Sequence, residues 1–498
     1  MDVLERRSQW SVAIPFAALA AAAQLLLTVP LAFILNVGQD DAYTLHTTAH
    51  GLAYAWGQAI SFEQNAPLYF IVIALWRHID FSAPFARLFS VFCAAGSVAL
   101  IPSVVRRYLP SIDPRWVAIP IAFNPFLIYM ALEIRVYALI ALLSLALLVV
   151  FHDAFWRERT NVRAGIVYSV LCAVALYTQY YLLFLIVAQG VAVLAVRRHR
   201  SSIWAYGAAV AAALAAFVPM LVILPSQMQN FAGAYAAPPT FFASMRVMAA
   251  ILLRYIVAFE GLPHPNLVTV IAVVSALVTV VLIHRSIRAN GEALLPAITV
   301  TAMVVFSCAI YVTHEHLLNR HVASLFFPAT LSVYSGFTFF REPVQRRLTI
   351  AWGIVALVLA IVALGVTYRD LAKPGDWIRV NRYLHAQERA DQPIAVFQAE
   401  NALALEYYYH GPNRVVPIPQ GVNFRVYDVS KFVIRDEAEL RRTFPRSHSG
   451  IWLVNAGGCR SANIEFGCDV VEQFVQQNYR VVKSAKFYRA SVRLLVPR

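Results

Sequence analysis

The sequence predicts an α-helical polytopic membrane protein of about 11 transmembrane helices, with a C-terminal extracytoplasmic α/β domain. Three observations lead to this fold class. Apolar residues make up 60% of the 498 residues and charged residues only 14%, a composition that excludes an ordinary soluble protein. Basic residues recur in short clusters between apolar runs. From about residue 369 the apolar runs give way to mixed polar sequence.

The first apolar run, Val12 to Leu35, is long enough to span the bilayer, so we expect a retained transmembrane helix and not a cleaved signal peptide. Arg6 and Arg7 precede it, and the positive-inside rule therefore places the N-terminus in the cytoplasm. Asp40 and Asp41 follow the run and are predicted outside. On this view the net charge of +14 reflects topology and does not indicate nucleic-acid binding.

Five later basic clusters test this topology, because each should be cytoplasmic and each pair of clusters leaves room for a helical hairpin. The clusters are Arg106-Arg107, Arg157 to Arg163, Arg197 to Arg200, His284 to Arg288 and Arg341 to Arg347. Further spans are predicted near residues 85–105, 116–132, 138–151, 164–176, 181–196, 203–224, 267–283, 293–312, 322–340 and 348–366. The apolar run Leu68 to Trp76 is short, and counting it as a span would put the clusters outside, so we expect a re-entrant or interfacial helix.

Two domains are predicted, a transmembrane domain over 1–368 and a soluble α/β domain over 369–498, which an odd number of spans places outside. All four lysines, at 373, 431, 483 and 486, lie in the soluble domain. A phosphate held by the membrane domain must therefore be bound by Arg, His or backbone groups. Cys459 and Cys468 are either a disulfide of an oxidising compartment or two free thiols, and the other three cysteines fall in predicted spans.

The first polar cluster is the adjacent pair Asp40 and Asp41, with His46, His50 and Glu63 in the same predicted outer loop. Two neighbouring carboxylates repel each other, so one could have a raised pKa and act as a general base, or the pair could bind a divalent cation. The structural alternative is a solvated loop whose acids cap a helix. Two acids at the mouth of a membrane helix favour the functional interpretation.

The second cluster is Glu133-Ile-Arg135-Val-Tyr137, in a predicted tight outer turn between two spans. Charges this close to hydrocarbon need a partner, which is either the neighbouring charge or a ligand. The Arg135 guanidinium could hold a lipid phosphate by two hydrogen bonds, and a local Glu133–Arg135 pair is the structural alternative.

The third cluster is His314-Glu-His316-Leu-Leu-Asn-Arg320-His321, between two late spans. Its His-x-His spacing differs from the His-x-x-x-His of a helical zinc site, so we prefer an anion-binding group built on Arg320 and the histidines. A polar interfacial belt is the structural alternative.

Two further segments have a simpler interpretation. Tyr177 to Tyr181 is interpreted as part of an aromatic belt, and the segment 225–265 is predicted to form interfacial helices.

Five motifs in a fixed order resemble the GT-C glycosyltransferases, in the branch of the protein O-mannosyltransferases and the lipid A aminoarabinose transferase. They are Asp40-Asp41 after the first helix, Asn-Ala-Pro-Leu-Tyr-Phe at 65–70, Arg87, Glu-x-Arg-x-Tyr at 133–137 and Asn-Arg-His at 319–321. The resemblance covers roughly the first 340 residues. The chain departs from the branch pattern at Asp41, where Glu is common, at Asn65, where His is common, and at His321, where Tyr is common.

The resemblance implies transfer of a sugar from a polyprenyl-phosphate donor to a hydroxyl of a lipid, glycan or protein on the outer, periplasmic face of the inner (plasma) membrane. It requires no organic cofactor, and Asp40 and Asp41 are the residues that would hold any divalent metal. A single displacement at the anomeric carbon would invert its configuration. The expected site is Asp40 as base, with Asp41 as its partner or as the base itself. The donor phosphate would meet Arg135, Arg320 and His316, supported by Glu133, Tyr137, Asn65 and His314.

Two other functions are compatible with a many-helix, basic membrane protein. A transporter or flippase of lipid-linked sugars would not need an acid pair in an outer loop or a folded outer domain. A polysaccharide ligase shares the lipid-phosphate chemistry, and differs in using a long glycan on a diphosphate donor.

Overall fold

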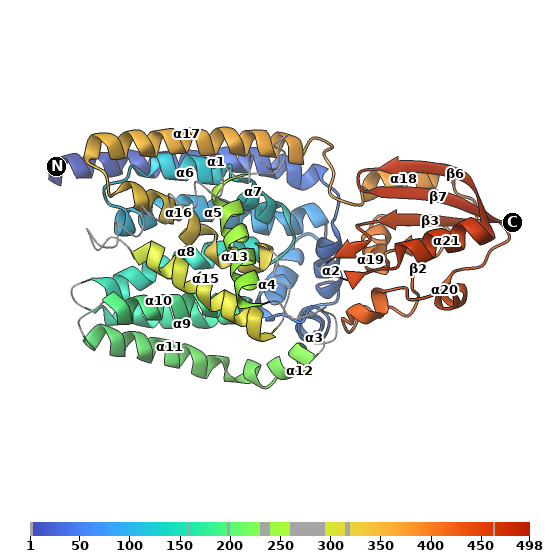
Figure 1. Ribbon diagram of the computed structural model, residues 1–498, viewed down its shortest axis with the longest axis horizontal. Coiled ribbons are helices and arrows are strands. Elements are labelled where there is room, and N and C mark those ends of the chain that lie inside the picture. The colour runs from blue at the N-terminus through green and yellow to red at the C-terminus, as the bar shows by residue number, and fades with distance from the viewer. Residues whose placement is uncertain are drawn as a thin grey trace. The chain divides into compact units, whose positions relative to one another are not determined.

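The computed structural model describes residues 3–157, 160–196, 200–229, 240–258, 294–313, 319–461 and 464–498. The chain forms two compact units (Figure 1). The helical unit comprises Met1–Ala32, Pro84–Val222 and Pro239–Tyr368. The mixed unit comprises Phe33–Ala83, Ile223–Pro238 and Arg369–Arg498, so the loop after the first helix packs with the C-terminal sequence.

Apolar helices of different lengths build the helical unit. They are α1 (Val3–Ile34), α5 (Ala83–Tyr108), α6 (Arg115–Ala122), α7 (Pro125–Leu132), α8 (Tyr137–Phe151), α9 (Val162–Thr178), α10 (Leu182–Val196), α11 (Arg200–Leu221), α13 (Phe241–Ile256), α15 (Leu294–Thr313), α16 (Phe326–Phe337) and α17 (Glu342–Thr367). Among the described residues, six helical segments of 20 to 28 residues are long and apolar enough to cross a membrane, and a bent pair makes a seventh. The chain is therefore a multi-pass membrane protein.

Helices occupy ten of the eleven predicted spans, and the remaining one, 267–283, lies outside the described residues. The number of spans itself stays a prediction, because α9, α10 and α16 are shorter than the usual transmembrane length. The short helix α4 (Leu68–Arg77) has ten residues and reaches about 15 Å, half the hydrocarbon thickness. It cannot cross the bilayer alone, which agrees with the re-entrant or interfacial interpretation.

The predicted span 116–132 is not one straight helix. α6 and α7 meet at an angle of 52°. Pro125 cannot donate a backbone hydrogen bond at the first position of α7, and the Asn124 side chain caps that helix by accepting from the Phe126 N–H at 2.9 Å. The same side chain donates to the carbonyl oxygen of Tyr255 at 2.9 Å, so the bend is tied to the end of α13.

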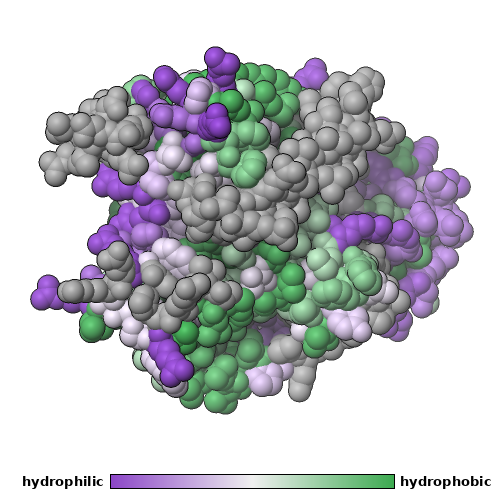
Figure 2. All heavy atoms as spheres, turned by 60° about the vertical axis from the view of Figure 1, so that its left-hand side comes forward, coloured by the Kyte–Doolittle hydropathy of each residue, from purple (hydrophilic) through white to green (hydrophobic). Residues whose placement is uncertain are grey.

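The helical unit exposes apolar side chains in stripes. On α9 the exposed residues Val162, Ile166 and Val170 are four positions apart, and on α17 Ile354, Val358 and Ile361 have similar spacing. This spacing puts each set on one side of its helix. Figure 2 shows hydrophobic side chains over broad areas of the face that it presents. In a bilayer such stripes contact lipid.

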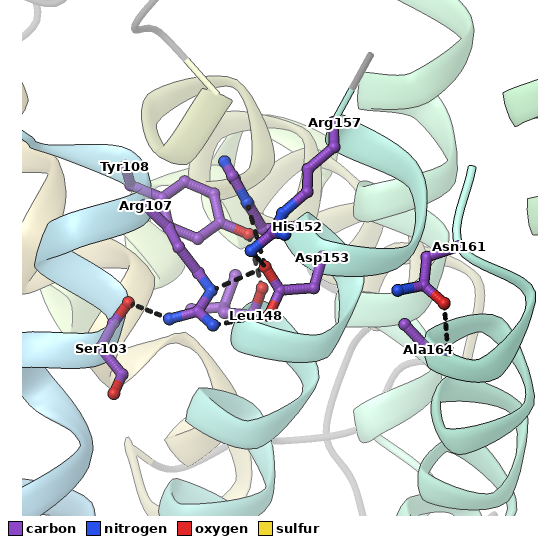
Figure 3. Close-up of polar contacts among 9 residues, drawn as sticks. All are labelled: Ser103, Arg107, Tyr108, Leu148, His152, Asp153, Arg157, Asn161 and Ala164. Atoms are coloured by element: carbon purple, nitrogen blue, oxygen red, sulfur yellow. Dashed lines mark hydrogen bonds and ion pairs between the residues drawn. The ribbon is translucent and has the colours of Figure 1, made fainter. Parts of the chain in front are cut away.

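Arginines from two of the basic clusters donate hydrogen bonds to the same carboxylate, that of Asp153 (Figure 3). Arg107, at the end of α5, donates to both oxygens of Asp153, at 3.1 Å and 2.5 Å. Arg157 donates to Asp153 at 2.7 Å. Asp153 lies in a π-helical turn, His152–Trp156, that continues α8. The clusters at 106–107 and 157 therefore lie at the same end of α5 and α8, as the arginine pattern predicts.

The mixed unit contains a five-stranded sheet in the order β2-β1-β3-β7-β6. β1 is parallel to β2 and β3, whereas β7 is antiparallel to β3 and β6. The strands are β1 (Ile394–Phe397), β2 (Val415–Pro417), β3 (Ile451–Ala456), β6 (Tyr479–Phe487) and β7 (Ala490–Pro497), with a separate hairpin of β4 (Arg460–Ser461) and β5 (Ile464–Glu465). The strands predicted around 450–454 and 479–482 are confirmed as β3 and β6.

The helices of the mixed unit are α2 (Gln39–Thr47), α3 (Leu52–Ser61), α4, α12 (Leu224–Gln229), α18 (Trp377–Gln387), α19 (Ala402–Glu406), α20 (Glu437–Thr443) and α21 (Cys468–Asn478). Leu440 of α20, Phe444 directly after it, and Val471 and Phe474 of α21 belong to one apolar core with residues of the sheet. α18 lies against Trp452 and Phe487 through Tyr383. Cys459 and Cys468 form a disulfide.

Candidate functional site

The acid pair lies in the first turn of α2, in the mixed unit. Asp41 is fully buried, and its Oδ2 accepts from the Gly38 N–H at 3.0 Å and from Lys373 Nζ at 2.6 Å. Asp40 is half-buried at the preceding position. A helix N-terminus favours negative charge, and an ammonium partner favours it further, so Asp41 is held as a carboxylate. The two acids therefore differ: one is built into the fold and the other is more accessible.

Residues of the C-terminal sequence anchor the segment that enters α2. The Lys373 N–H donates to Asn36 Oδ1 at 2.7 Å. The Val37 N–H donates to the hydroxyl of Tyr408 at 2.8 Å. Both contacts lie inside the mixed unit. The position of the acid pair therefore depends on a backbone N–H and a tyrosine hydroxyl that lie more than 330 residues further along the chain.

Aromatic side chains surround the rest of α2. Tyr43 is buried, with its ring 5.0 Å from that of Phe62 and 6.3 Å from that of Phe424. Burial, assisted by the nearby charge of Glu400, raises the pKa of Tyr43 well above its ordinary value, so its hydroxyl stays protonated. Phe424 also lies 6.3 Å from the ring of His46. Phe424, in the loop 419–428, thus packs against the side chains of Tyr43 and His46 on α2.

The other predicted residues of this loop have structural contacts. His46 Nε2 lies 3.2 Å from the Tyr54 hydroxyl, and burial, followed by the charge of His50, lowers the pKa of His46. Glu63 accepts a hydrogen bond from Thr47 at 3.2 Å, and Asn65 donates to the Glu63 carbonyl oxygen at 2.8 Å. These contacts shape the turns around α2 and α3, and they give Asn65 a local structural role.

In the helical unit, Glu133 and Arg135 lie in the short turn between α7 and α8. Both side chains are only 9% exposed. The Ser90 hydroxyl lies 3.5 Å from the Arg135 carbonyl oxygen. Tyr137 begins α8, and its ring stacks with that of Tyr129 at 6.5 Å. The structure therefore confirms a tight turn at 133–136 and places a buried guanidinium in it.

Arg320 lies in a 3₁₀ turn, η2 (Asn319–Leu325), that packs against α8. Its backbone N–H donates to Asn319 Oδ1 at 2.8 Å, and Tyr255 of α13 donates to the Asn319 carbonyl oxygen. His321 stacks on Tyr181, with ring centroids 6.3 Å apart and planes inclined by 28°. The turn is thus fixed from two sides. His314 and His316 lie outside the described residues.

A series of contacting aromatic rings connects the turn that holds Arg135 with the turn that holds Arg320, and we call these two segments the arginine turns. Tyr129 stacks on Phe126 at 6.1 Å, and Phe126 lies 4.5 Å from Tyr255. Tyr129 contacts Tyr137 next to Arg135, and Tyr255 contacts Asn319 next to Arg320. Both guanidinium groups therefore belong to neighbouring elements of one packed region.

Sequence reasoning missed three residues of these sites. The sequence indicates only that Lys373 belongs to the soluble domain and that Tyr181 belongs to an aromatic belt, and it gives no signal for Tyr255. Nothing in the sequence indicates that a lysine pairs with a residue 332 positions away. Tyrosines near the ends of spans are common because they lie at the membrane interface, so they do not by themselves indicate a site. The signal that the sequence offers is that Lys373 is the first lysine of the chain and follows the last predicted span.

The donor set around the acid pair does not suit a divalent metal. Among the described residues, no group of three or more His, Cys, Asp or Glu side chains comes together as a metal site. At the acid pair, an ammonium already lies against Asp41 Oδ2, and its charge would repel a second cation. No step is therefore derived through a metal.

The apolar helices and the C-terminal sheet unit define a membrane protein of the GT-C fold, the fold that the resemblance implies. A crystal structure of ArnT from Cupriavidus metallidurans bound to undecaprenyl phosphate is similar over 96% of this chain and 97% of that one, with 12% identity and a TM-score of 0.55. The apo state of the same protein is similar over 95% of this chain and 97% of that one, with 12% identity and a TM-score of 0.57.

An arabinofuranosyltransferase, AftD from Mycobacteria, aligns over 97% of this chain and 42% of its own, with 14% identity and a TM-score of 0.42, too low to define a shared fold. No family model matches the chain, and no curated protein matches it by sequence. At 12% identity the likeness to ArnT shows the fold, and the function must be argued from the residues.

Proposed function

We propose that this protein is a membrane glycosyltransferase that moves a sugar from a polyprenyl-phosphate donor to a hydroxyl acceptor at the outer face of the cell membrane. The observation that carries the proposal is the pair of arginine turns, with Arg135 buried and Arg320 half-buried in neighbouring elements of an apolar unit. Guanidinium groups in such surroundings suit a lipid phosphate, which they can bind through two hydrogen bonds each. The fold shared with a structure of ArnT bound to undecaprenyl phosphate supports the same donor class.

In the proposed reaction the acceptor hydroxyl attacks the anomeric carbon while Asp40 accepts its proton. A new carbon–oxygen bond forms, and the bond between the anomeric carbon and the phosphate oxygen breaks. The leaving polyprenyl phosphate takes the electron pair, and Arg135 and Arg320 would stabilise its growing negative charge. One displacement inverts the anomeric configuration, and the donor is already activated, so the reaction uses no organic cofactor.

Asp40 is the better candidate for the base. Its half-buried side chain is more accessible than that of Asp41, whose Oδ2 is bonded to Lys373 and to the Gly38 N–H. A carboxylate bonded to an ammonium is a weak base, which argues against Asp41 in that role. Asp41 then contributes its negative charge, and it accepts the hydrogen bond from the Gly38 N–H at the start of α2, without taking the proton.

The test is sugar transfer by purified protein from a panel of radiolabelled polyprenyl-monophosphate sugars, with lipid, glycan and peptide acceptors. We expect Asp40→Asn to lower turnover at least about 100-fold while donor binding is retained. Asp469→Asn, an exposed acid at the start of α21, is the matched control and should leave turnover unchanged.

Two results would replace the proposal. If labelled lipid crosses liposome membranes at the same rate with Asp40→Asn and no sugar is transferred, the protein is a transporter. If only long glycans on a diphosphate lipid are consumed, it is a polysaccharide ligase. The acceptor that gains label identifies the acceptor class directly.

A further inference from the structure

The last two strands of the chain carry only positive charge. Residues 479–498, which form β6, β7 and the turn between them, contain six basic residues and no acidic residue. The segment 369–498 holds 19 basic and 13 acidic residues, so its last 20 residues account for its whole excess of positive charge. The six basic residues are Arg480, Lys483, Lys486, Arg489, Arg493 and Arg498.

Most of these charges are not neutralised by the protein. Within the part of the chain that the structure describes, only Arg493 of the six has a carboxylate partner, Glu472, at 2.6 Å. Lys483 donates to the amide oxygen of Gln387 at 2.7 Å, and Arg498 donates to a backbone carbonyl oxygen at 3.3 Å. All six except Arg493 are exposed. The strands therefore present a surface with a net positive charge.

The charges lie along the open edge of the sheet. β6 is the edge strand next to β7 (Figure 1), and no described strand pairs with its other side. Side chains 480–484 are exposed on both faces of β6. The register with β7 puts Arg480 and Lys483 on one face of the sheet and Lys486 on the other. Positive groups therefore follow the edge on both sides, at intervals of three residues, or about 10 Å.

Further guanidinium groups lie at the start of β6. Burial raises the pKa of Tyr479, the first residue of β6, and the charges of Arg446 and Arg441 oppose this shift, so both arginines lie near it. Arg441 is paired with Glu437, whereas the exposed Arg446 forms no ion pair with a described carboxylate. The Arg498 guanidinium donates to the Tyr479 carbonyl oxygen. We call the surface formed by Arg446, Arg480, Lys483, Lys486, Arg489 and Arg498 the β6 surface.

Protection of the sheet edge does not explain this surface fully. Charged side chains on an edge strand prevent it from pairing with another chain, and so does a β-bulge, which β6 has between Val481 and Lys483. Such protection works with charges of either sign, and here every charged residue of both strands is basic. It also gives no reason for the positive surface to continue to Arg446, outside the strand. An anionic partner accounts for both features.

The geometry favours a flexible polymer as this partner. A flat bilayer surface can contact only one face of the strand, whereas a chain laid along the edge can reach the groups on both faces. An added peptide strand would need a continuous ladder of backbone hydrogen bonds, and the bulge interrupts that ladder. Guanidinium groups bind carboxylate or phosphate through two hydrogen bonds, and lysine binds them as a point charge.

We propose that the β6 surface binds a linear acidic glycan, and that this glycan is the acceptor of the transferred sugar. The inference rests on the proposed function, and it deepens that proposal by naming the acceptor class. Asp40 belongs to the same compact unit as β6. A long glycan held at β6 has its other hydroxyl groups at a raised effective concentration near the acid pair.

The scarcity of lysine makes amine labelling a sharp test. Lys483 and Lys486 lie on β6, Lys373 is buried, and Lys431 is exposed in a pair with Asp428 outside the β6 surface. The full-length protein in neutral-lipid nanodiscs is acetylated briefly, with and without oligogalacturonate, and each lysine is followed by mass spectrometry. At about ten times its Kd, oligogalacturonate should slow acetylation of the two β6 lysines about tenfold and leave Lys431 unchanged. Neutral dextran should protect neither, and about 1 M salt should abolish the protection.

Variants test the same surface by binding. The test variant removes three charges of the β6 surface, with Arg480→Gln, Lys486→Gln and Arg489→Gln. The matched control removes two arginines and one lysine from exposed positions elsewhere in the unit, with Arg389→Gln, Arg414→Gln and Lys431→Gln. Fluorescence anisotropy of labelled oligogalacturonate should show about tenfold weaker binding by the test variant, because each basic contact to a polyanion releases counterions. The control should bind as the wild type does.

Four results would overturn the inference. They are unprotected β6 lysines, equal protection of Lys431, unchanged binding by the test variant, and stronger protection by polyglutamate than by oligogalacturonate. A second comparison uses nanodiscs with and without anionic lipid. If the anionic lipid alone protects the β6 lysines, the occupant is the membrane surface and the glycan assignment is wrong.

Failure of this inference can be distinguished from failure of the proposed function, because labelling and binding do not depend on turnover. If the wild type binds oligogalacturonate but transfers no sugar to any acceptor, the proposed function fails and the glycan surface stands. If sugar is transferred, the test variant should raise the KM for an acidic acceptor about tenfold and leave kcat and the donor KM unchanged. An unchanged acceptor KM would overturn the assignment of the acceptor and leave the proposed function intact.

Discussion

Tyr255 donates a hydrogen bond from its hydroxyl to the carbonyl oxygen of Asn319, the residue before Arg320. Tyr255 is itself fully buried, and its own carbonyl oxygen accepts from Asn124 at the bend between α6 and α7. One tyrosine therefore connects the broken span to the turn that presents Arg320. Its contribution can be measured separately from the charge of the arginine.

We expect Tyr255→Phe to weaken donor use without unfolding the protein. The change removes one hydrogen bond, worth about 1 kcal/mol, and leaves the aromatic contacts with Phe126 and Phe326 in place. The KM for the polyprenyl-phosphate donor should rise about fivefold, because the Arg320 turn loses one of its supports. Tyr311→Phe, at an exposed position of α15, serves as the control. Identical kinetics for the two variants would show that Tyr255 does not position the turn.

The ion pairs of Asp153 predict membrane topology. Arg107 and Arg157 bind the same carboxylate, so both must lie on one side of the bilayer, which we expect to be cytoplasmic. In a Cys308→Ser background, a membrane-impermeant maleimide should label Lys486→Cys in intact cells and should label Arg157→Cys only after the membrane is opened. Labelling of Arg157→Cys in intact cells would contradict the cytoplasmic location of the Asp153 ion pairs, and no labelling of Lys486→Cys in intact cells would contradict an outer C-terminal domain.

The fold could be read from the sequence to a large extent, because the bilayer imposes simple rules. Long apolar runs in a bilayer must be helical, so most helices of the helical unit coincide with predicted spans. The break at Asn124 was not predicted, although Asn followed by Pro within an apolar run is a recognisable helix start. The pairing of 33–83 with the C-terminal sequence had no local signal, since it depends on contacts between distant segments.

The candidate site could be predicted only in part. The burial of Arg135 follows from its place in a short turn between two apolar runs. The different environments of Asp40 and Asp41 could not be foreseen, because the two residues are adjacent and chemically identical. Asp41 is bonded to Lys373, and no residue near α2 in the sequence indicates that partner. His314 and His316 stay predictions.

The mixed unit should lose stability in mild acid through His46. Burial lowers the pKa of this histidine in the folded protein, so the unfolded chain binds a proton near pH 6.5 while the folded chain does not. Stability is therefore full above about pH 6.5 and falls as the pH drops below it. Thermal unfolding between pH 8 and pH 5 should show a smaller fall in Tm for His46→Gln than for the wild type. His448→Gln, at an exposed position, should behave as the wild type.

The disulfide between Cys459 and Cys468 should add stability and report the compartment of the mixed unit. It closes a short loop that carries the β4–β5 hairpin and ends at the first residue of α21. The loop-entropy estimate for a ring of this size is about 2–3 kcal/mol, which Cys459→Ser with Cys468→Ser should remove from the free energy of unfolding. Alkylation of the protein from native membranes, before and after reduction, should show two thiols that become reactive only after reduction. Because disulfides persist where the environment is oxidising, two reactive thiols without reduction would argue against an outer location for this unit.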